Sequence, residues 1–157
     1  MTDGHDGGRD EAALLVGTWK LQSWHSVGER ADITQPMGHN PEGLLIYTAD
    51  GTMMTVISRA GRTPFATKDL MGGTPEEMAA AMSSFVAYGG TYELEGHLIR
   101  HHVKVSLFPN WVGTTQTRAM LIDPTGDELT LTAEPMVVGK SLRAQRLRFE
   151  RVKGAAK

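Results

Sequence analysis

The sequence predicts an all-β protein with a single antiparallel, up-and-down barrel of about eight strands and one helix, at about residues 74–87, placed at an opening. Two observations support this. Apolar and polar residues alternate over several short segments joined by tight, turn-rich connections. A meander of that many strands also leaves two costly edges unless it closes on itself. The length of 157 residues suits one domain, and we expect a disordered tail over 1–12 and a barrel domain over 13–153.

The expected elements follow one another along the whole chain. Asp50-Gly51 between two apolar runs is typical of a hairpin. Thr74 is the expected N-cap of the helix, with Pro75 at its first position and Glu77 three residues after the cap, and Gly89-Gly90 is expected to stop it. The predicted strands cover residues 14–27, 43–48, 52–58, 91–95, 97–108, 114–123, 128–134 and 141–152.

One predicted strand, 97–108, organises the candidate site. Side chains alternate between the two faces of a strand, so one face is apolar except for His101, while His102 lies on the other. The inward set is Ile99, His101, Val103, Val105 and Leu107. The strand ends in a loop that carries Asn110 and Trp111. This pattern predicts the wall and rim of a small-molecule cavity, although a half-buried strand with a hydrogen-bonded core histidine would look the same.

Composition excludes several classes of function. A net charge of −2 without a Lys/Arg block gives no reason to expect nucleic acid as a partner. Since there is no apolar run of bilayer length, no cysteine and no signal-peptide pattern, we expect no membrane partner and a cytoplasmic location. Neither a phosphate loop nor a dinucleotide fingerprint occurs, so we expect no cofactor. His101 and His102 point to opposite faces and no HExxH motif exists, so we expect no metal.

The inward faces of the predicted strands supply the candidate site residues. His101 could act as a general acid or base, and Tyr47 could supply proton transfer or a hydrogen bond to developing charge. Arg118 could hold a carboxylate, an enolate or a 1,3-dicarbonyl by paired donors. Arg118 could equally be an outward salt-bridging residue, and His25 a core histidine bonded to backbone. The candidate ligand-binding residues are His25, Ser23, Tyr88, Tyr92, Asn110, Trp111 and Met53.

Several segments resemble a known family. NPEGLLIYTADGTM (40–53), GTPEEMAAAMSSFVAYGGTYEL (73–94) and HHVKVSLFPNWVGTTQTR (101–118) are similar to the bacterial and fungal lipocalin-like domain family, which has a calycin-type barrel. GTWKL (17–21) and LRFERV (147–152) resemble the flanking strands of such barrels. In lipocalins a Gly-x-Trp sits at the barrel base under an arginine of the last strand. The resemblance therefore implies that Trp19 is covered by one of three arginines: Arg146, Arg148 or Arg151.

The resemblance also implies a function. Unlike secreted lipocalins, this chain has no cysteine and no signal peptide, and its helix lies between the third and fourth strands, so an intracellular barrel is expected. Members of the family often lie in natural-product pathways, and some barrels of this kind are cofactor-free cyclases or isomerases. The first hypothesis is that the protein binds an apolar, oxygen-bearing molecule and cyclises or isomerises it. The alternatives are a carrier or sensor of a hydrophobic ligand and, more weakly, a haem-binding barrel with His101 or His25 as axial ligand.

Overall fold

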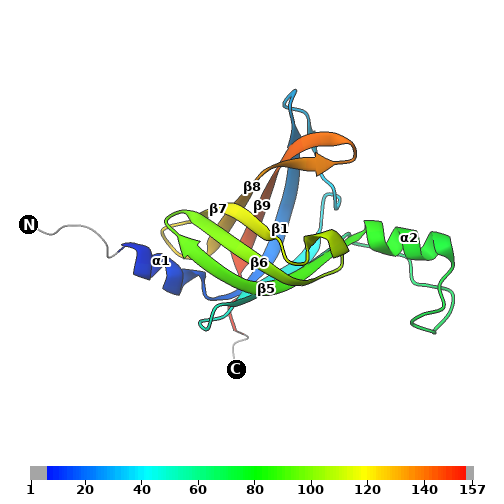
Figure 1. Ribbon diagram of the computed structural model, residues 1–157, viewed down its shortest axis with the longest axis horizontal. Coiled ribbons are helices and arrows are strands. Elements are labelled where there is room, and N and C mark those ends of the chain that lie inside the picture. The colour runs from blue at the N-terminus through cyan, green and yellow to red at the C-terminus, as the bar shows by residue number, and fades with distance from the viewer. Residues whose placement is uncertain (1–6, 155–157) are drawn as a thin grey trace, which may run out of the picture.

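The structure is a computed structural model that describes residues 7–154. It consists of a meander of strands, two helices and one 3₁₀ turn (Figure 1). In chain order the elements are α1 (Gly7–Leu15), β1 (Gly17–Gly28), β2 (Ile33–Thr34), β3 (Glu42–Tyr47), β4 (Thr52–Ser58), α2 (Pro75–Ser83), β5 (Phe85–Glu95), β6 (Leu98–Ser106), η1 (Pro109–Trp111), β7 (Thr115–Ile122), β8 (Glu128–Val138) and β9 (Ser141–Arg151).

The sheet closes into a barrel. Neighbouring strands pair antiparallel in the order β2-β1-β3-β4-β5-β6-β7-β8-β9, and β1 also pairs with β9. Closure therefore joins the eight strands β1 and β3 to β9, while the short β2 is an extra strand on β1. The predicted all-β, lipocalin-like barrel is confirmed. It removes the two open edges that a flat meander would expose to solvent.

One end of the barrel is closed by Trp19 and Arg151. Trp19 is completely buried, and the Arg151 guanidinium lies 4.2 Å from its ring centroid. Arg151 also donates to the carbonyl of Gly126 at 2.8 Å and to that of Val16 at 3.1 Å. Trp19 donates through its indole N–H to the carbonyl of Leu15 at 2.9 Å. Of the three arginines that the sequence left open, Arg151 is the one that covers the tryptophan.

The N-terminal region differs from the prediction of a disordered tail over 1–12. Residues 1–6 lie outside the described residues, but residues 7–12 belong to α1, and the first strand begins at Gly17 rather than at Leu14. The reason lies at the end of this helix, where Leu15 is completely buried in the core beside Trp19. Anchoring Leu15 against the barrel therefore gives α1 a tertiary partner that sequence patterning did not reveal.

The second helix is shorter than predicted. Its start is as expected, because Thr74 and Glu77 form a reciprocal capping box. It ends at Ser83, however, and Phe85 already begins β5. Gly89-Gly90 does not stop a helix but lies inside β5 at a bulge, where a Cβ on Gly90 would come within 1.9 Å of a β6 backbone oxygen. These glycines allow a close approach of two strands, which is a second use of glycine in sheets.

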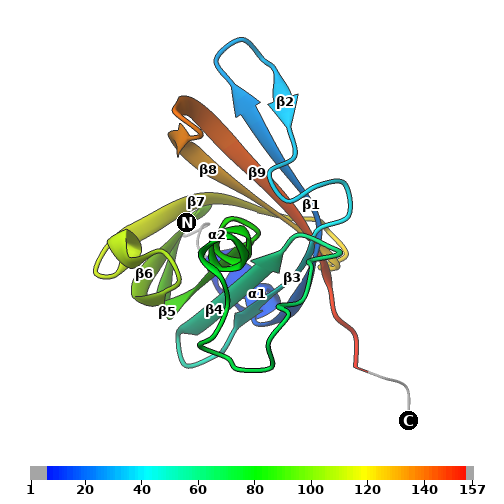
Figure 2. The same cartoon turned by 90° about the vertical axis from the view of Figure 1, so that its right-hand side faces the viewer.

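The two helices lie at opposite ends of the barrel (Figure 1), and α2 stands in front of the open end when the barrel is viewed from that side (Figure 2). None of the residues of α2 is buried, and Met78 and Met82 remain 45% and 42% exposed. The helix is therefore beyond the opening rather than inserted into it. Within the described chain, neither helix is long and apolar enough to cross a membrane.

Three bulges change which side chains face inward, and one of them shifts the pairing of β8 with β9 between Ala133 and Met136. In β1 the pairing with β9 shifts between Leu21 and Ser23, so Trp24 and Ser26 point inward beyond that point. In β6 the pairing with β5 shifts after Val103, and Val105 is 61% exposed although strict alternation placed it inside. A bulge inserts one unpaired residue and so inverts the phase of the strand that follows.

Candidate functional site: a cavity inside the barrel

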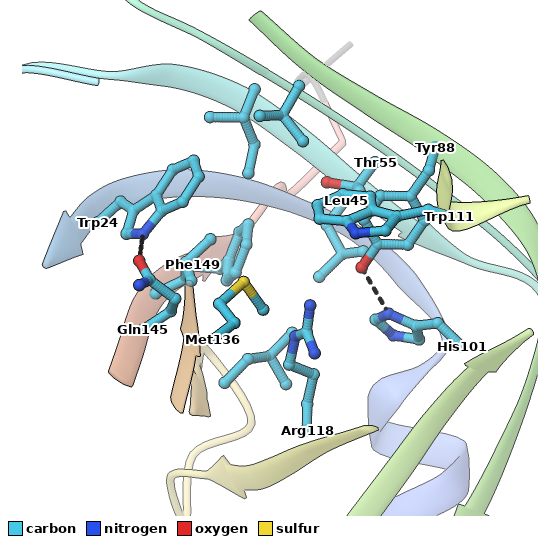
Figure 3. A pocket seen from close by; sticks show the side chains of 14 residues that line it. Trp24, Leu45, Thr55, Tyr88, His101, Trp111, Arg118, Met136, Gln145 and Phe149 are labelled. Carbon is cyan, nitrogen blue, oxygen red and sulfur yellow. Dashed lines mark hydrogen bonds between the residues drawn. The ribbon is translucent and has the colours of Figure 1, made fainter. Parts of the chain in front are cut away.

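A cavity lies inside the barrel and is lined by residues of every barrel strand and of η1. Figure 3 shows its side chains from close by. Its lining residues are Trp24, Leu45, Thr55, Ile57, Val86, Tyr88, His101, Trp111, Arg118, Leu131, Met136, Gln145, Leu147 and Phe149. Its volume is about 60 Å³. Since an apolar cavity that takes up benzene measures about 150 Å³, a ring-sized ligand must displace lining side chains. Met136 is unbranched and adaptable, which suits it to move.

One buried polar group at the cavity is a chain of three side chains, Tyr47–His101–Tyr88. His101 is 1% exposed, and each of its ring nitrogens meets one tyrosine. The Tyr47 hydroxyl lies 2.7 Å from Nε2 and the Tyr88 hydroxyl 2.8 Å from Nδ1. The three side chains come from three strands, Tyr47 from β3, Tyr88 from β5 and His101 from β6.

Burial sets the charge state of this chain. It lowers the pKa of His101 from 6.5 to about 3, and the nearby positive charge of Arg118 adds to that effect. Burial likewise raises the pKa of Tyr47 well above 10.0, and raises that of Tyr88 against the opposing influence of Arg118. At neutral pH all three groups are therefore uncharged. His101 cannot be the group titrating near pH 6–7 that an exposed histidine would supply.

Arg118 is the one charged side chain among the cavity's lining residues. Its guanidinium lies beside the Tyr88 hydroxyl and points into the cavity (Figure 3). It donates to the carbonyl of Thr117 at 3.0 Å and approaches Oε1 of Gln116 at 3.4 Å. None of the salt bridges in the described part of the chain includes it. A cation that faces a mainly apolar cavity without a carboxylate partner costs desolvation free energy. A hydrogen bond to a ligand oxygen would offset that cost.

The opposite wall carries a second polar group, which is internally satisfied. Trp24 donates to Oε1 of Gln145 at 2.6 Å (Figure 3), and Nε2 of Gln145 donates to the Ser26 hydroxyl at 3.0 Å. Arg143 donates to the same hydroxyl at 2.9 Å and to the Asp32 carboxylate at 2.7 Å. The arginine holds the pKa of Asp32 below its usual range. This network ties the β1–β2 connection to β9 and leaves few free polar atoms to a ligand.

The structure brings together only part of the predicted site. His101, Tyr88, Arg118 and Trp111 line the cavity, and Tyr47 lies directly behind His101. As predicted, His102 points outward, where it contacts Glu93 and Thr115.

Five other predicted residues lie elsewhere. Ser23 and His25 do not face the cavity, in contrast to the prediction, because the β1 bulge precedes them. Met53 belongs to the core and does not reach the cavity. Tyr92 donates to the carbonyl of Thr48 at 2.6 Å instead of facing the cavity, and Asn110 is exposed on η1. Strand phase, rather than residue type, therefore decides which polar groups reach the site.

Sequence reasoning missed Trp24, Gln145 and Met136. Trp24 did give a signal, since it broke the alternation of its strand, and that break is the mark of the bulge. Gln145 and Met136 gave none, because their role depends on the register of β8 with β9. Within the described residues no group of three or more His, Asp or Glu side chains is placed to hold a metal ion.

Comparison with known proteins adds three findings. Residues 16–152 match a family described as a lipocalin-like domain. The 4'-hydroxy-3'-methoxypropiophenone carrier protein ppsC of Aspergillus oryzae is 35% identical over 95 residues, which cover 55% of this chain and 84% of that protein. The crystal structure of a mutant of the fluorescent protein UnaG aligns with a TM-score of 0.37 and 17% identity, over 87% of this chain and 94% of that one. That last likeness is too weak to inform function.

Proposed function

Because this chain belongs to the lipocalin-like domain family, we propose that it binds and carries an apolar, oxygen-bearing small molecule inside its barrel. One observation carries the proposal: a mainly apolar cavity inside the barrel with Tyr88 and Arg118 side by side on one wall. Ligand sites are commonly built in this way, from an apolar surface that supplies affinity and a few polar groups that fix orientation.

The similarity to ppsC supports the same class of ligand. The printed name of that protein describes it as a carrier of 4'-hydroxy-3'-methoxypropiophenone, which is an apolar ring with oxygen at both ends. A ring of this kind would face the apolar strands, with one oxygen at Tyr88 and Arg118. We further propose a role in natural-product metabolism. A cytoplasmic location agrees with the absence of cysteine from the sequence.

A second candidate function is cofactor-free cyclisation or isomerisation in the same cavity. The Tyr47–His101–Tyr88 chain favours it, because hydrogen-bonded groups in series can pass a proton to or from a bound ligand. In that case His101, Tyr47 and Arg118 would form the catalytic group. The barrel would add the benefit of holding a flexible substrate near its reactive geometry, roughly 7–11 kcal/mol in the best cases.

A haem-binding barrel fits less well. Both ring nitrogens of His101 are engaged by tyrosine hydroxyls, so coordination of iron would break a buried hydrogen bond. His25 does not line the cavity. We expect the absorption spectrum of the purified protein to lack a Soret band. A Soret band would support haem binding.

The proposed function is tested by titrating the protein with 4'-hydroxy-3'-methoxypropiophenone and following tryptophan fluorescence. Trp24 and Trp111 line the cavity, so binding should change the emission. Tyr88→Phe should weaken binding roughly 2–10-fold, the range for one lost hydrogen bond. The matched control, His102→Ala, alters the outer face and should bind as the wild type does.

Mass spectrometry of the ligand after incubation separates the two candidates. A carrier returns the ligand unchanged. A product that forms with wild-type protein and His102→Ala but not with folded His101→Ala would establish catalysis. If the folded protein binds neither this ketone nor other aryl ketones, the proposed function is wrong.

A further inference from the structure

The direction of each hydrogen bond in the Tyr47–His101–Tyr88 chain follows from counting hydrogens. A neutral imidazole carries one N–H and one acceptor nitrogen, and each tyrosine carries one O–H. The chain therefore has three donor hydrogens, one N–H and two O–H, but only two hydrogen bonds between its members. One tyrosine donates to His101 and the other accepts from it. The accepting tyrosine keeps an O–H that must find a partner elsewhere.

Burial identifies that tyrosine. Tyr47 is 1% exposed, and within the described chain its hydroxyl has His101 as its hydrogen-bond partner. If Tyr47 were the acceptor, its own O–H would be buried without a partner, at a cost comparable to a lost hydrogen bond. Tyr88 instead lines the cavity. The assignment is therefore that Tyr47 donates to Nε2, Nδ1–H donates to the oxygen of Tyr88, and the O–H of Tyr88 points to the cavity.

Arg118 supplies the second free donor at the same place. It lies beside the Tyr88 hydroxyl, and its charge has no carboxylate partner in the described part of the chain. Two other polar side chains of the cavity wall are already engaged: Thr55 donates to the carbonyl of Leu44, and Gln145 is held by Trp24 and Ser26. None of the lining residues is acidic. The cavity thus offers one positive charge and one polarised hydroxyl, side by side.

We propose that the ligand binds in its ionised form, as a phenolate or an enolate, with the charged oxygen held between the Tyr88 O–H and the Arg118 guanidinium. This rests on the proposed binding function and names the chemical class of its ligand. A carboxylate is a poorer match. It has two oxygens with about four lone-pair sites to satisfy, whereas part of the donor capacity of Arg118 is already directed at Thr117 and Gln116. A phenolate spreads its charge into the ring and needs fewer donors.

The probe for this proposal is 4-nitrophenol, whose neutral and ionised forms absorb at different wavelengths. At the pH where the free probe is half ionised, an excess of protein should raise the phenolate fraction to roughly nine-tenths, which means about tenfold tighter binding of the anion. Arg118→Met should abolish this preference, and Arg118→Lys should retain part of it. Arg100→Met removes the same charge from the outer face, where Arg100 pairs with Glu95, and should leave the preference unchanged.

Two further ligands separate the possible failures. 4-Nitroanisole cannot ionise, and benzoate carries its charge on a carboxylate; both should bind more weakly than the phenolate. If 4-nitrophenol binds with an unchanged ionised fraction and 4-nitroanisole binds equally well, the proposed ionised oxygen is wrong while the binding function stands. If benzoate binds tighter than the phenolate, the ligand class is wrong. If folded protein binds neither the probes nor an aryl ketone, the proposed function itself fails.

Nitrogen-15 NMR of His101 tests the assignment without relying on any variant. Nδ1 should be protonated and Nε2 should be a bare acceptor near neutral pH. Protonation at Nε2 instead would mean that Tyr88 donates to His101 and has no hydrogen for a ligand, which would overturn the proposal.

Discussion

Tyr47→Phe is the substitution that most directly tests the buried hydrogen-bond chain. It removes a single oxygen and leaves the ring and its core packing intact. In the wild type that hydroxyl donates to Nε2 of His101 over 2.7 Å, and both residues are 1% exposed. The variant therefore leaves a buried ring nitrogen without a partner, and the site is too enclosed for water to replace the lost hydroxyl freely.

The expected cost is the desolvation penalty of one unsatisfied buried group, about 1–3 kcal/mol. For a chain of this length, each kcal/mol lowers the melting temperature by roughly 2–4 °C. Urea unfolding at pH 7.5, followed by tryptophan fluorescence, should show the lower free energy of unfolding with an unchanged m-value. Replacing both partners, in Tyr47→Phe with His101→Leu, should cost less than the two single changes added together. The double variant has neither the unpaired Nε2 that Tyr47→Phe leaves nor the unpaired Tyr47 hydroxyl that His101→Leu leaves.

Tyr92→Phe is the matched control. Its hydroxyl donates to the carbonyl of Thr48 at a part-buried position, where water can take over the bond. Its loss should cost only about 0.5–1.5 kcal/mol. If Tyr47→Phe is as stable as the wild type, or no worse than Tyr92→Phe, then His101 does not depend on Tyr47 and the directional argument for Tyr88 loses its basis.

Three other outcomes are expected. Trp19→Ala should cost roughly 3–5 kcal/mol in unfolding experiments, as a large-to-small change at a completely buried position; unchanged melting would mean that the closed end is not part of the core. Gly90→Ala should cost about 3 kcal/mol or more, because the new Cβ would lie 1.9 Å from the backbone oxygen of His102, and a soluble variant of near wild-type stability would show that the bulge can open. Burial lowers the pKa of His101 from 6.5 to about 3, so between these values the unfolded chain binds the extra proton and stability falls as the pH drops. The free energy of unfolding should fall by about 1.4 kcal/mol per pH unit from this group. In His101→Leu, the free energy of unfolding should therefore depend less steeply on pH between pH 7 and 4.5. An equal slope in the variant and the wild type would place the pKa of His101 near its usual value.

Much of the barrel could be predicted from local patterns. Alternating side chains gave the strands, Asp50-Gly51 gave the β3–β4 hairpin, and Thr74 with Glu77 gave the start of α2. Each of these depends on a few neighbouring residues, which is why sequence alone suffices. His101 was also placed correctly, because it lies before the irregularity in β6.

The errors begin where the register changes. Past the β1 bulge, Ser23 and His25 turn away from the cavity and Trp24 turns into it, and past the β6 bulge Val105 becomes exposed. A bulge depends on how two strands fit each other, so alternation within one strand cannot reveal it. The predicted length of α2 was wrong for a related reason. Phe85 and the residues after it pair with β4 and therefore belong to β5.

Local sequence patterns were therefore enough to predict the fold class, the strand that carries His101 and the residue types available for a site. Which of these residues come into contact depends on the assembled barrel. Tyr47 and His101 are 54 residues apart in the chain, and Tyr88 and His101 are 13 apart. Their contact depends on barrel closure, on strand register and on the bulge at Gly89-Gly90. The same packing buries His101 deeply enough to keep it neutral and leaves Arg118 facing the cavity without a carboxylate, because burial and pairing are properties of the assembled barrel rather than of any segment.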